Sequence, residues 1–426
     1  MLAPRVQALP DSGKHGEGIV VGLLDKGQRV ISRGGVDVDD VFEIGSITKV
    51  FTASLLADMV ARGEARLDDP VANYLPRAVR MPVRGRPITL LDLATQSSGL
   101  PRMPDNFTPR DSSNPYADYS VQQLYEFLSR YQLPRDPGAA YEYSNLGMGL
   151  LGHALALKAG MSYEQLVTHR ILRPLGMKET SITLTKGLDA RLAPGHDGEG
   201  HVVHNWDLPT LAGAGALRST ATDLITFMVA NLDSTATPLS RTLYQTHGER
   251  QATNDPNLKI GLAWHILSRP VGKIVWHNGG TGGYRSFIGF DAVRRIGVVV
   301  LCNNGNENVD DIGFHLLDET FPLKSPPPRR TEVAVDSMGV GSLRGRLRAD
   351  AGLSHRRHAP GGPFVRAGNR AAAVRDLCGV GLDVLSQGGR RPAHVQAGRA
   401  GAASERPART GPQGALDSGR CNGASD

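Results

Sequence analysis

Apolar residues in the first 330 positions form strand-length runs at both ends of this segment and longer helical runs between them. Near the start, the apolar runs 19–24 and 28–31 flank turn residues at 25–27, and this pattern predicts a β-hairpin. Four further strands are predicted at 261–267, 273–276, 287–290 and 297–301. Tight turns between the later runs favour antiparallel neighbours.

The middle of this segment has the apolar spacing of helices, which are predicted at 48–61, 121–131, 146–158 and 221–231. Strands from both ends with helices between them predict an α+β fold. In this fold, one antiparallel sheet is built from N- and C-terminal strands and flanked by helices, with a mainly helical subdomain. No run approaches the ~18–20 apolar residues of a membrane span, so we expect no integral membrane segment.

The composition changes after the Pro-rich run at 326–330. In residues 331–426, Gly, Ala and Arg supply 17, 16 and 14 of 96 positions, and Ile, Lys, Tyr and Trp are absent. Such a chain buries little apolar surface, so we expect a folded domain at 1–325 and a disordered tail at 331–426. Two other interpretations of the tail are an Arg-rich arm for nucleic acid, which its interleaved acids disfavour, and an out-of-frame translation of GC-rich DNA.

The net charge of +6 comes from this tail, because residues 1–330 hold 34 basic and 34 acidic groups. A neutral folded part argues against DNA or an anionic membrane as a partner. Three cysteines, Cys302, Cys378 and Cys421, are too few for a disulfide framework and form no C-x-x-C spacing, so we expect no metal or cofactor. The first residues lack the ~7–15 apolar positions of a signal-peptide core, and no export signal is visible.

The first chemical motif is segment 42–49, Phe-Glu-Ile-Gly-Ser-Ile-Thr-Lys, at the start of a predicted helix. Ser46 and Lys49 are three positions apart and therefore share a helix face. A serine hydroxyl needs a base to become a nucleophile, and a buried lysine whose pKa falls from ~10.4 towards neutrality can be that base. The helix is apolar on almost every side, so we expect Lys49 to be buried. A capping serine followed by a surface lysine is the competing interpretation.

The second motif is segment 141–147, Tyr-Glu-Tyr-Ser-Asn-Leu-Gly. In an extended segment, Tyr143 and Asn145 would point to the same side. Cationic neighbours that lower the pKa of Tyr143 would allow it to shuttle protons. The alternative is an ordinary start of a helix with Ser144 or Asn145 as its cap.

The third motif is the strand end and glycine-rich stretch 275–283, which contains His277, Asn278, Gly279 and Gly280. Glycines leave bare backbone that a substrate can approach closely. By itself His277 fits equally well as a satisfied histidine of a strand.

In this order, with separations of 97 and 134 residues, the three motifs resemble those of the penicillin-recognising serine hydrolases. This family includes class C β-lactamases, related D-Ala-D-Ala carboxypeptidases and β-lactamase-like esterases. Segment 42–49 resembles the class C nucleophile motif, 143–145 resembles its Tyr-x-Asn motif, and 277–279 falls where the family has Lys-Thr-Gly or His-x-Gly. Segments 93–100 and 212–220 are also similar to the family. The resemblance covers roughly residues 15–322.

The resemblance implies a reaction, acyl transfer to water without a cofactor or metal, and a set of catalytic groups. Ser46 would attack a carbonyl, and Lys49 and Tyr143 would exchange its proton. The backbone N–H groups of Ser46 and Gly280 would stabilise the oxyanion. Asn145 would hold the amide side chain of the substrate.

The resemblance also implies that the third motif binds substrate through His277, Asn278, Gly279 and Gly280, with His277 organising Tyr143 and receiving an anionic group. Here the chain departs from typical class C enzymes, which carry a lysine where this sequence has His277. A neutral histidine attracts a carboxylate less strongly than a lysine does.

We favour a β-lactam as the substrate, because Phe-Glu-Ile-Gly-Ser is most similar to class C. A carboxylic ester or a D-Ala-D-Ala peptide is the alternative within the same chemistry. A non-hydrolysing penicillin-binding or sensor protein is the alternative outside it. Family members of these types act outside the cytoplasm, so the lack of a visible export signal raises the hypothesis of a misassigned or truncated start.

Overall fold

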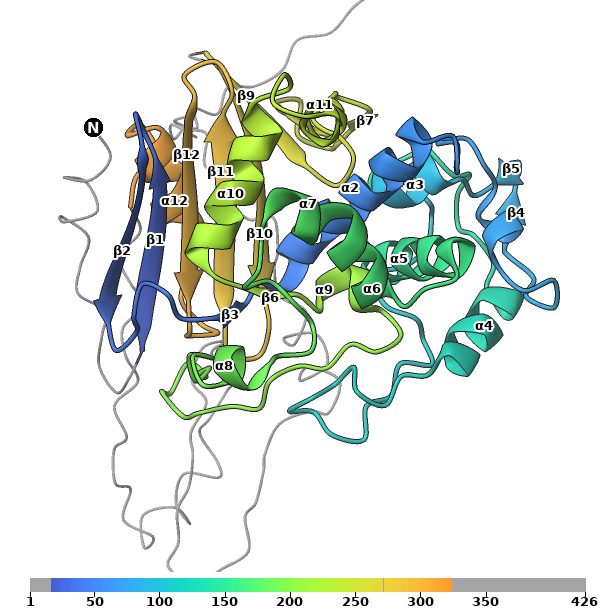
Figure 1. Ribbon diagram of the computed structural model, residues 1–426. Helices are drawn as coiled ribbons and strands as arrows, with labels where there is room; N and C mark the ends of the chain where they lie inside the picture. The colour runs from blue at the N-terminus through green and yellow to red at the C-terminus, as the bar shows by residue number, and fades with distance from the viewer. Residues whose placement is uncertain (1–16, 271, 324–426) are drawn as a thin grey trace, which may run out of the picture. The chain divides into compact units, whose positions relative to one another are not determined.

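The computed structural model describes residues 17–270 and 272–323, so the predicted tail at 331–426 lies outside the described residues. An eight-stranded antiparallel sheet runs in the order β2-β1-β12-β11-β10-β9-β8-β7 (Figure 1). Its strands are β1 (Gly18–Leu24), β2 (Gln28–Gly34), β7 (Gln251–Ala252), β8 (Leu258–Ile260), β9 (His265–Arg269), β10 (Gly272–Gly280), β11 (Arg285–Asp291) and β12 (Ile296–Cys302).

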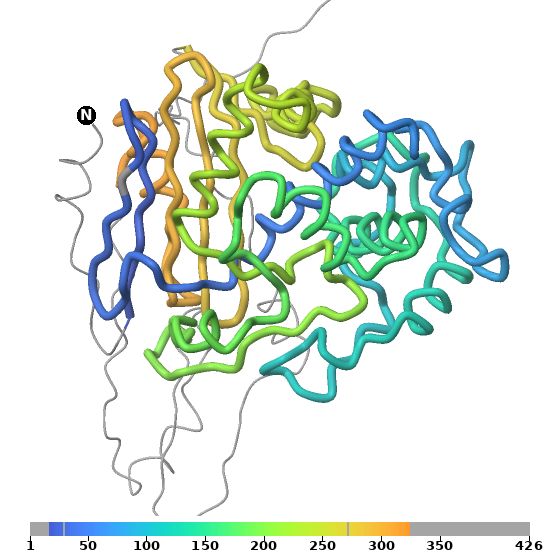
Figure 2. Tube along the Cα trace, viewed as in Figure 1, coloured from blue at the N-terminus to red at the C-terminus, as the bar shows by residue number. Residues whose placement is uncertain are grey.

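The two ends of the domain meet inside this sheet. β1 pairs with β12 in antiparallel register, with Val20 opposite Leu301, and Figure 2 shows the N-terminal hairpin beside the C-terminal strands. The predicted hairpin, the α+β class and the sheet built from both ends are confirmed. Lys26, at φ 56°, and Gly27 form the turn between β1 and β2.

Side chains alternate between the two faces of the sheet, and each face has its own core. On β12, Val299 and Leu301 join the larger core, whereas Val298 and Val300 join the smaller one. α10 (Ala221–Leu232) and the helical subdomain cover the first face, and α12 (Asp310–Leu317) covers the second. This alternation decides which strand residues can face the helices.

Four helices follow the sequence pattern closely: α2 (Thr48–Ala61), α4 (Val121–Arg130), α5 (Asn145–Ala159) and α10. The pattern did not predict the shorter helical segments η2 (Val71–Tyr74), α3 (Leu90–Ala94), α6 (Tyr163–Val167), η3 (Thr168–Leu172), α7 (Arg173–Leu175), α8 (Lys186–Asp189), α9 (Ala212–Gly215) and α11 (Pro238–Gln245). Two small sheets pair β3 (Phe42–Glu43) with β6 (Arg218–Ser219) and β4 (Val83–Arg84) with β5 (Arg86–Pro87).

The predicted strand at 261–267 is wrong in its first half. The Gly261 N–H donates to the Trp264 carbonyl at 2.8 Å, and Ala263 has a φ of 62°, so these residues form a turn. The strand β9 begins only at His265. An apolar run does not distinguish a buried turn from a strand, since both place their side chains in the core.

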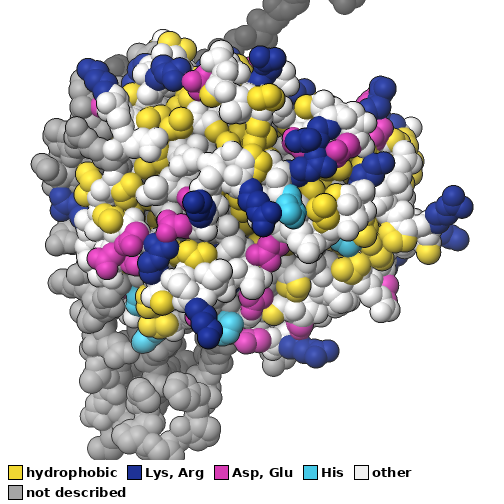
Figure 3. All heavy atoms as spheres, in the orientation of Figure 1, with side chains coloured by type: hydrophobic (Ala, Val, Ile, Leu, Met, Phe, Trp, Pro, Cys, Tyr) yellow, Lys and Arg dark blue, Asp and Glu magenta, His cyan; other side chains and the backbone are white. Residues whose placement is uncertain are grey.

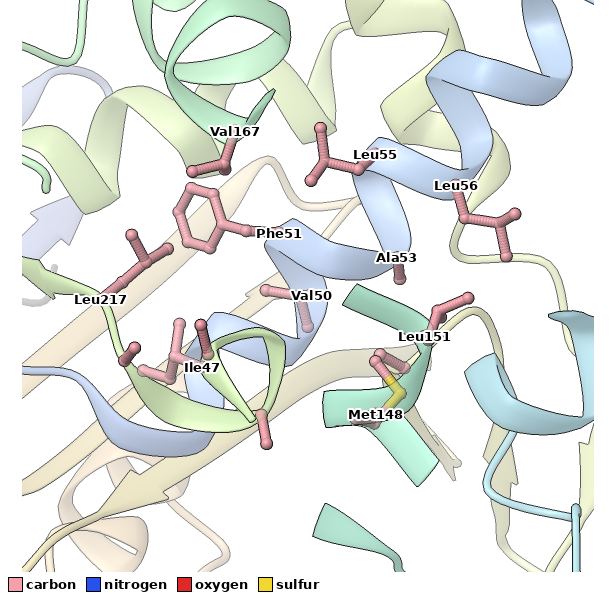
Figure 4. Packing of buried hydrophobic residues seen from close by; sticks show 14 of the residues in the cluster. Ile47, Val50, Phe51, Ala53, Leu55, Leu56, Met148, Leu151, Val167 and Leu217 are labelled. Carbon is pink, nitrogen blue, oxygen red and sulfur yellow. The ribbon is translucent and has the colours of Figure 1, made fainter. Parts of the chain in front are cut away.

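α2 is the central helix of the larger core, and its residues from Thr48 to Met59 are all buried (Figure 4). It has no polar stripe because other elements surround it on every side. It ends at Ala61, and Gly63, two positions later, has a φ of 70°, the left-handed conformation that commonly follows a helix. A lysine on this helix is therefore removed from water.

Charged side chains of both signs are interspersed over the face of the molecule in Figure 3. Within the described residues, no helix has both the length and the apolar character that crossing a membrane requires.

Candidate active site

Ser46 lies on a 3₁₀ turn, η1 (Gly45–Ile47), immediately before α2 rather than on α2 itself. The turn begins at Gly45, which has a φ of 48°. A methyl group at Gly45 would lie 2.7 Å from the backbone nitrogen of Gly280. Only glycine therefore allows the serine turn and the end of β10 to lie so close together. Ser46 itself is half-buried.

Lys49 lies one turn further along and is fully buried, as predicted. Its Nζ is 2.8 Å from Ser46 Oγ and 2.7 Å from the Ala214 carbonyl oxygen. Burial, aided by the positive charge of Arg102, holds the pKa of Lys49 well below its usual value. Burial therefore favours the neutral amine beside the serine hydroxyl.

Tyr143 lies beside this pair. Lys49 Nζ is 4.9 Å from the centroid of its ring, and a hydrogen bond links Tyr143 to Ser46. Burial raises the pKa of Tyr143 to about 12, and the Ser46 hydrogen bond and the charge of Arg102 offset only part of this rise. The phenol is therefore protonated at neutral pH, in contrast to the lowered pKa that a proton shuttle would favour.

The second motif is a helix start as well as part of the site. Ser144 is the N-cap of α5, and its Oγ accepts a hydrogen bond from the Gly147 N–H at 2.8 Å. Asn145 is the first residue of α5, and Ser144, between it and Tyr143, is extended, with φ −133° and ψ 111°, so the predicted extended segment runs up to the helix start. Asn145 Nδ2 donates to Tyr116 Oη at 3.3 Å, whereas its buried Oδ1 has no protein partner.

In the third motif, strand alternation separates His277 from Asn278. His277 is fully buried, and its ring centroid is 6.4 Å from that of Tyr143. Asn278 Nδ2 donates to Asp310 of α12 at 2.6 Å, so its side chain lies on the opposite face of the sheet. The structure thus brings His277 to Tyr143, and it does not bring the Asn278 side chain there.

His277 is a neutral side chain in this setting. Burial, together with repulsion from His265 and Lys49 in their protonated forms, holds its pKa well below the usual value. Its Nδ1 lies 2.6 Å from the Asn278 carbonyl oxygen, which can only accept a hydrogen bond. The proton is therefore on Nδ1, and Nε2 remains an acceptor.

The two glycines of the third motif allow close backbone approach. A methyl group at Gly279 would lie 2.1 Å from the Ile44 carbonyl oxygen, and one at Gly280 would lie 2.8 Å from Arg285 Nη1. Ser286 Oγ also donates to the Ile44 carbonyl at 2.9 Å. These contacts hold the end of β10 against the segment that carries the serine.

Comparison with known proteins agrees with this arrangement. The family model described as "Beta-lactamase" matches residues 3–317. The chain belongs to the β-lactamase family. Over 318 residues it is 31% identical to the D-alanyl-D-alanine-carboxypeptidase/endopeptidase AmpH of Escherichia coli (strain K12), covering 68% of this chain and 80% of that protein.

Solved structures of the β-lactamase family have the same fold. The class C β-lactamase from Rhodobacter sphaeroides superimposes with a TM-score of 0.63 and 27% identity, over 72% of this chain and 96% of that one. The β-lactamase/D-alanine carboxypeptidase from Yersinia pestis gives a TM-score of 0.60 and 26% identity, over 68% and 88%. The predicted family and fold class are confirmed.

Sequence reasoning missed three contributors to the site of this β-lactamase family member. The Ala214 carbonyl holds Lys49, and the guanidinium carbon of Arg102 is 5.0 Å from the Tyr143 ring centroid. Gln96, at a φ of 58°, accepts a hydrogen bond from the Ser144 N–H through its side chain at 2.6 Å. Segments 93–100 and 212–220 pointed to Gln96 and Ala214 by similarity, and Arg102 lies two positions beyond the first of them.

One group of potential metal ligands occurs among the described residues: Asp197, Glu199 and His201, whose ligand atoms lie within 4.8 Å of one another. It is a surface turn, in which the Asp197 carboxylate accepts the backbone N–H groups of the other two. None of the three belongs to the motifs around Ser46.

Proposed function

We propose that this member of the β-lactamase family is a serine hydrolase that works through an acyl-enzyme on Ser46. The observation that carries the proposal is the 2.8 Å contact between Nζ of the fully buried Lys49 and Oγ of the half-buried Ser46. Because burial lowers the pKa of Lys49, its neutral amine can accept the hydroxyl proton as Ser46 attacks a carbonyl.

The proton then has a route to the leaving group. Tyr143, a protonated phenol hydrogen-bonded to Ser46, can accept a proton from one side while it donates to the other. The Oγ–carbon bond forms, the carbon–nitrogen or carbon–oxygen bond of the substrate breaks, and the departing atom takes the proton. Water then attacks the acyl-enzyme, and its proton returns along the same groups to regenerate Ser46.

In this proposal, the backbone N–H groups of Ser46 and Gly280 stabilise the oxyanion. The support is the close packing of Gly45, the residue before Ser46, against the backbone of Gly280. Preorganised amides of this kind are worth ~2.7–4 kcal/mol of transition-state stabilisation per donor. Gly279 makes the approach possible and so has a backbone role.

A β-lactam is the substrate we propose first. A β-lactam carries an amide side chain, and Asn145 Oδ1 is a buried acceptor without a protein partner, suited to an amide N–H. The relative AmpH is named a carboxypeptidase and endopeptidase, and the Rhodobacter sphaeroides protein is described as a class C β-lactamase. A carboxylic ester or a D-Ala-D-Ala peptide uses the same groups.

A three-substrate assay tests the proposal: a chromogenic cephalosporin, a p-nitrophenyl ester and a D-Ala-D-Ala peptide. The wild type should hydrolyse at least one, and Ser46→Ala should reduce that activity to background. Ser54→Ala is the matched control, because Ser54 is a buried serine of α2 whose hydroxyl bonds only the Val50 carbonyl, at 2.7 Å. Wild-type turnover in Ser46→Ala would reject the assignment.

The same assay separates a hydrolase from a penicillin-binding or sensor protein that does not turn over. Such a protein would be acylated at Ser46 and would hold a stable adduct of one ligand mass, detectable by mass spectrometry. A hydrolase should lose the adduct on the timescale of its turnover.

A further inference from the structure

Arg102 is a cation beside the reacting groups to which the proposed mechanism gives no contact with the substrate. Its guanidinium carbon is 5.0 Å from the Tyr143 ring centroid, and its side chain is half-buried. Its Nε is buried without a hydrogen-bond partner, and no carboxylate of the described residues pairs with it. A guanidinium without an anionic partner at this depth is costly, unless a ligand supplies one.

The backbone of Arg102 is fixed relative to the site. The Arg102 carbonyl accepts a hydrogen bond from the Leu146 N–H at 3.2 Å, and the neighbouring Pro101 carbonyl accepts one from Ser144 Oγ at 2.6 Å. Both partners belong to the start of α5, directly after Tyr143. These two bonds tie the backbone at 101–102 to the start of α5, from which the Arg102 side chain reaches the Tyr143 ring.

The other positive groups near Ser46 are not free to receive an anion. Lys49 is fully buried and bonded to Ser46 and Ala214. His277 is neutral, so the third motif contributes no charge. Arg285 donates to the carbonyls of Thr281 and Tyr284, and it shares the sheet face of Asp310 on α12.

We propose that Arg102 is a substrate-binding residue that receives the carboxylate of an anionic substrate. It thereby takes the place of the cation that the third motif lacks. The inference rests on the proposed function, and it names the substrate class as acyl compounds that carry a carboxylate. The planar guanidinium can bind both carboxylate oxygens at once, which a histidine at 277 cannot do.

The test measures binding in the Ser46→Ala background, so that it does not depend on turnover. The probes are a cephalosporin with a free carboxylate and its methyl ester, titrated by calorimetry. With Arg102 intact, the acid should bind more tightly than the ester. Arg102→Gln should weaken the acid about ten- to hundredfold and leave the ester unchanged. Arg102→Lys should recover part of the lost affinity, because lysine keeps the positive charge but lacks the planar guanidinium that binds both carboxylate oxygens.

Arg135→Gln is the matched control, since Arg135 is a half-buried arginine that already pairs with Glu142. It should change neither affinity, and thermal unfolding of each variant confirms that the fold is kept. The proposal would be overturned if the protein with Arg102 intact bound acid and ester equally, or did not bind the acid. It would also be overturned if Arg102→Gln weakened the binding of both probes equally. The hydrolase proposal is tested separately, by turnover. If the wild type hydrolyses a substrate and Ser46→Ala does not, that proposal stands even when the binding results overturn the role of Arg102.

Discussion

Burial of Lys49 is electrostatically unfavourable, and the same burial suits its proposed role as a base. Lys49 is fully buried, and its hydrogen-bond partners are Ser46 Oγ and the Ala214 carbonyl. Burying an ammonium without an anion favours its neutral form. The desolvation that penalises the charged lysine thus prepares the base that Ser46 needs.

Hydrolysis should therefore depend on pH through Lys49. The base works only when deprotonated, so the rate should rise with pH through the lowered pKa of Lys49 and fall below it. The pH profile of kcat/KM checks this. Lys49→Arg keeps a positive charge that does not titrate in this pH range. This variant should lose the activity and, with it, the rise of kcat/KM with pH. Full activity in Lys49→Arg would contradict the role of Lys49 as base.

The same shift makes stability depend on pH. The pKa of Lys49 is lower in the folded than in the unfolded state, where it is ~10.4, so the unfolded state binds more protons between the two values. The contribution of Lys49 to the free energy of unfolding is thus complete above ~10.4 and is lost as the pH falls towards the folded-state value. Lys49→Met should remove this pH dependence, measured by urea unfolding at several pH values. If the free energy of unfolding of Lys49→Met depended on pH as steeply as that of the wild type, the proposed contribution of Lys49 would be contradicted.

Gly45 tests the close approach between the serine turn and Gly280. In Gly45→Ala, the new methyl would meet the backbone nitrogen of Gly280 at 2.7 Å and its oxygen at 2.9 Å, so one of the two segments must move. Displacing the oxyanion amides should lower kcat by about tenfold or more. The assay is steady-state kinetics on the best substrate.

Gly63→Ala is the control for backbone strain. Gly63 has a similar φ of 70°, but no atom lies within 4 Å of a methyl group placed there. This variant should lose about 1–2 kcal/mol of stability and keep its kcat. Equal losses of kcat in both variants would show that the contact with Gly280 is irrelevant.

At the scale of elements, the start of α5 organises the site. Ser144 caps the helix through the Gly147 N–H and also donates to the Pro101 carbonyl at 2.6 Å. One hydroxyl therefore joins the helix that follows Tyr143 to the loop that carries Arg102. Ser144 thus serves both as the N-cap of α5 and as the contact between this helix and the loop at 101–102.

Ser144→Ala should remove both bonds, with a loss of about 1–2 kcal/mol of stability and a lower kcat, because Tyr143 and Arg102 lose a common anchor. Ser120→Ala is the control, since Ser120 caps α4 through the Gln123 N–H at 3.2 Å and is exposed. It should lose about 1 kcal/mol without a change in kcat. Chemical denaturation and steady-state kinetics check the two effects. An unchanged kcat in Ser144→Ala would argue that the link is only structural.

At the scale of the whole molecule, the fold brings distant parts of the chain together. β1 and β12, the second and third strands from the β2 edge of the sheet, pair with each other, and the Gly18 N–H donates to Asn303 Oδ1 at 2.7 Å. The site itself is assembled from η1 and the first turn of α2, the residues around the start of α5 and the end of β10. All of these lie within the described residues.

Deleting residues 331–426 should therefore leave hydrolysis intact, because every contact described around Ser46 is made by residues before 323. Kinetics of the shortened and the full chain should give the same kcat and KM for one substrate. Insoluble protein or a lost activity after the deletion would overturn the predicted independence of the domain from the tail.

The order of the longer strands and helices followed from the sequence by itself, and the three motifs of the proposed site were visible in it as well. The run of apolar residues around Lys49 has no polar stripe, so the burial of α2 was visible in the pattern. Alternation along β10 also implies that His277 and Asn278 face opposite sides. Apolar patterns do not separate every element. The strand predicted at 261–267 is a turn in its first half, since a buried turn is as apolar as a strand.

Tertiary structure alone decided the electrostatics and the close contacts of the site. The pKa of Tyr143 rises to about 12 because desolvation outweighs its neighbours, a balance that no local pattern contains. The bond from Lys49 to Ala214 spans 165 positions, and Arg102 reaches Tyr143 from a loop outside the three motifs. Periodicity reports which residues are buried, whereas charge interactions depend on distances in space that only the packed chain sets.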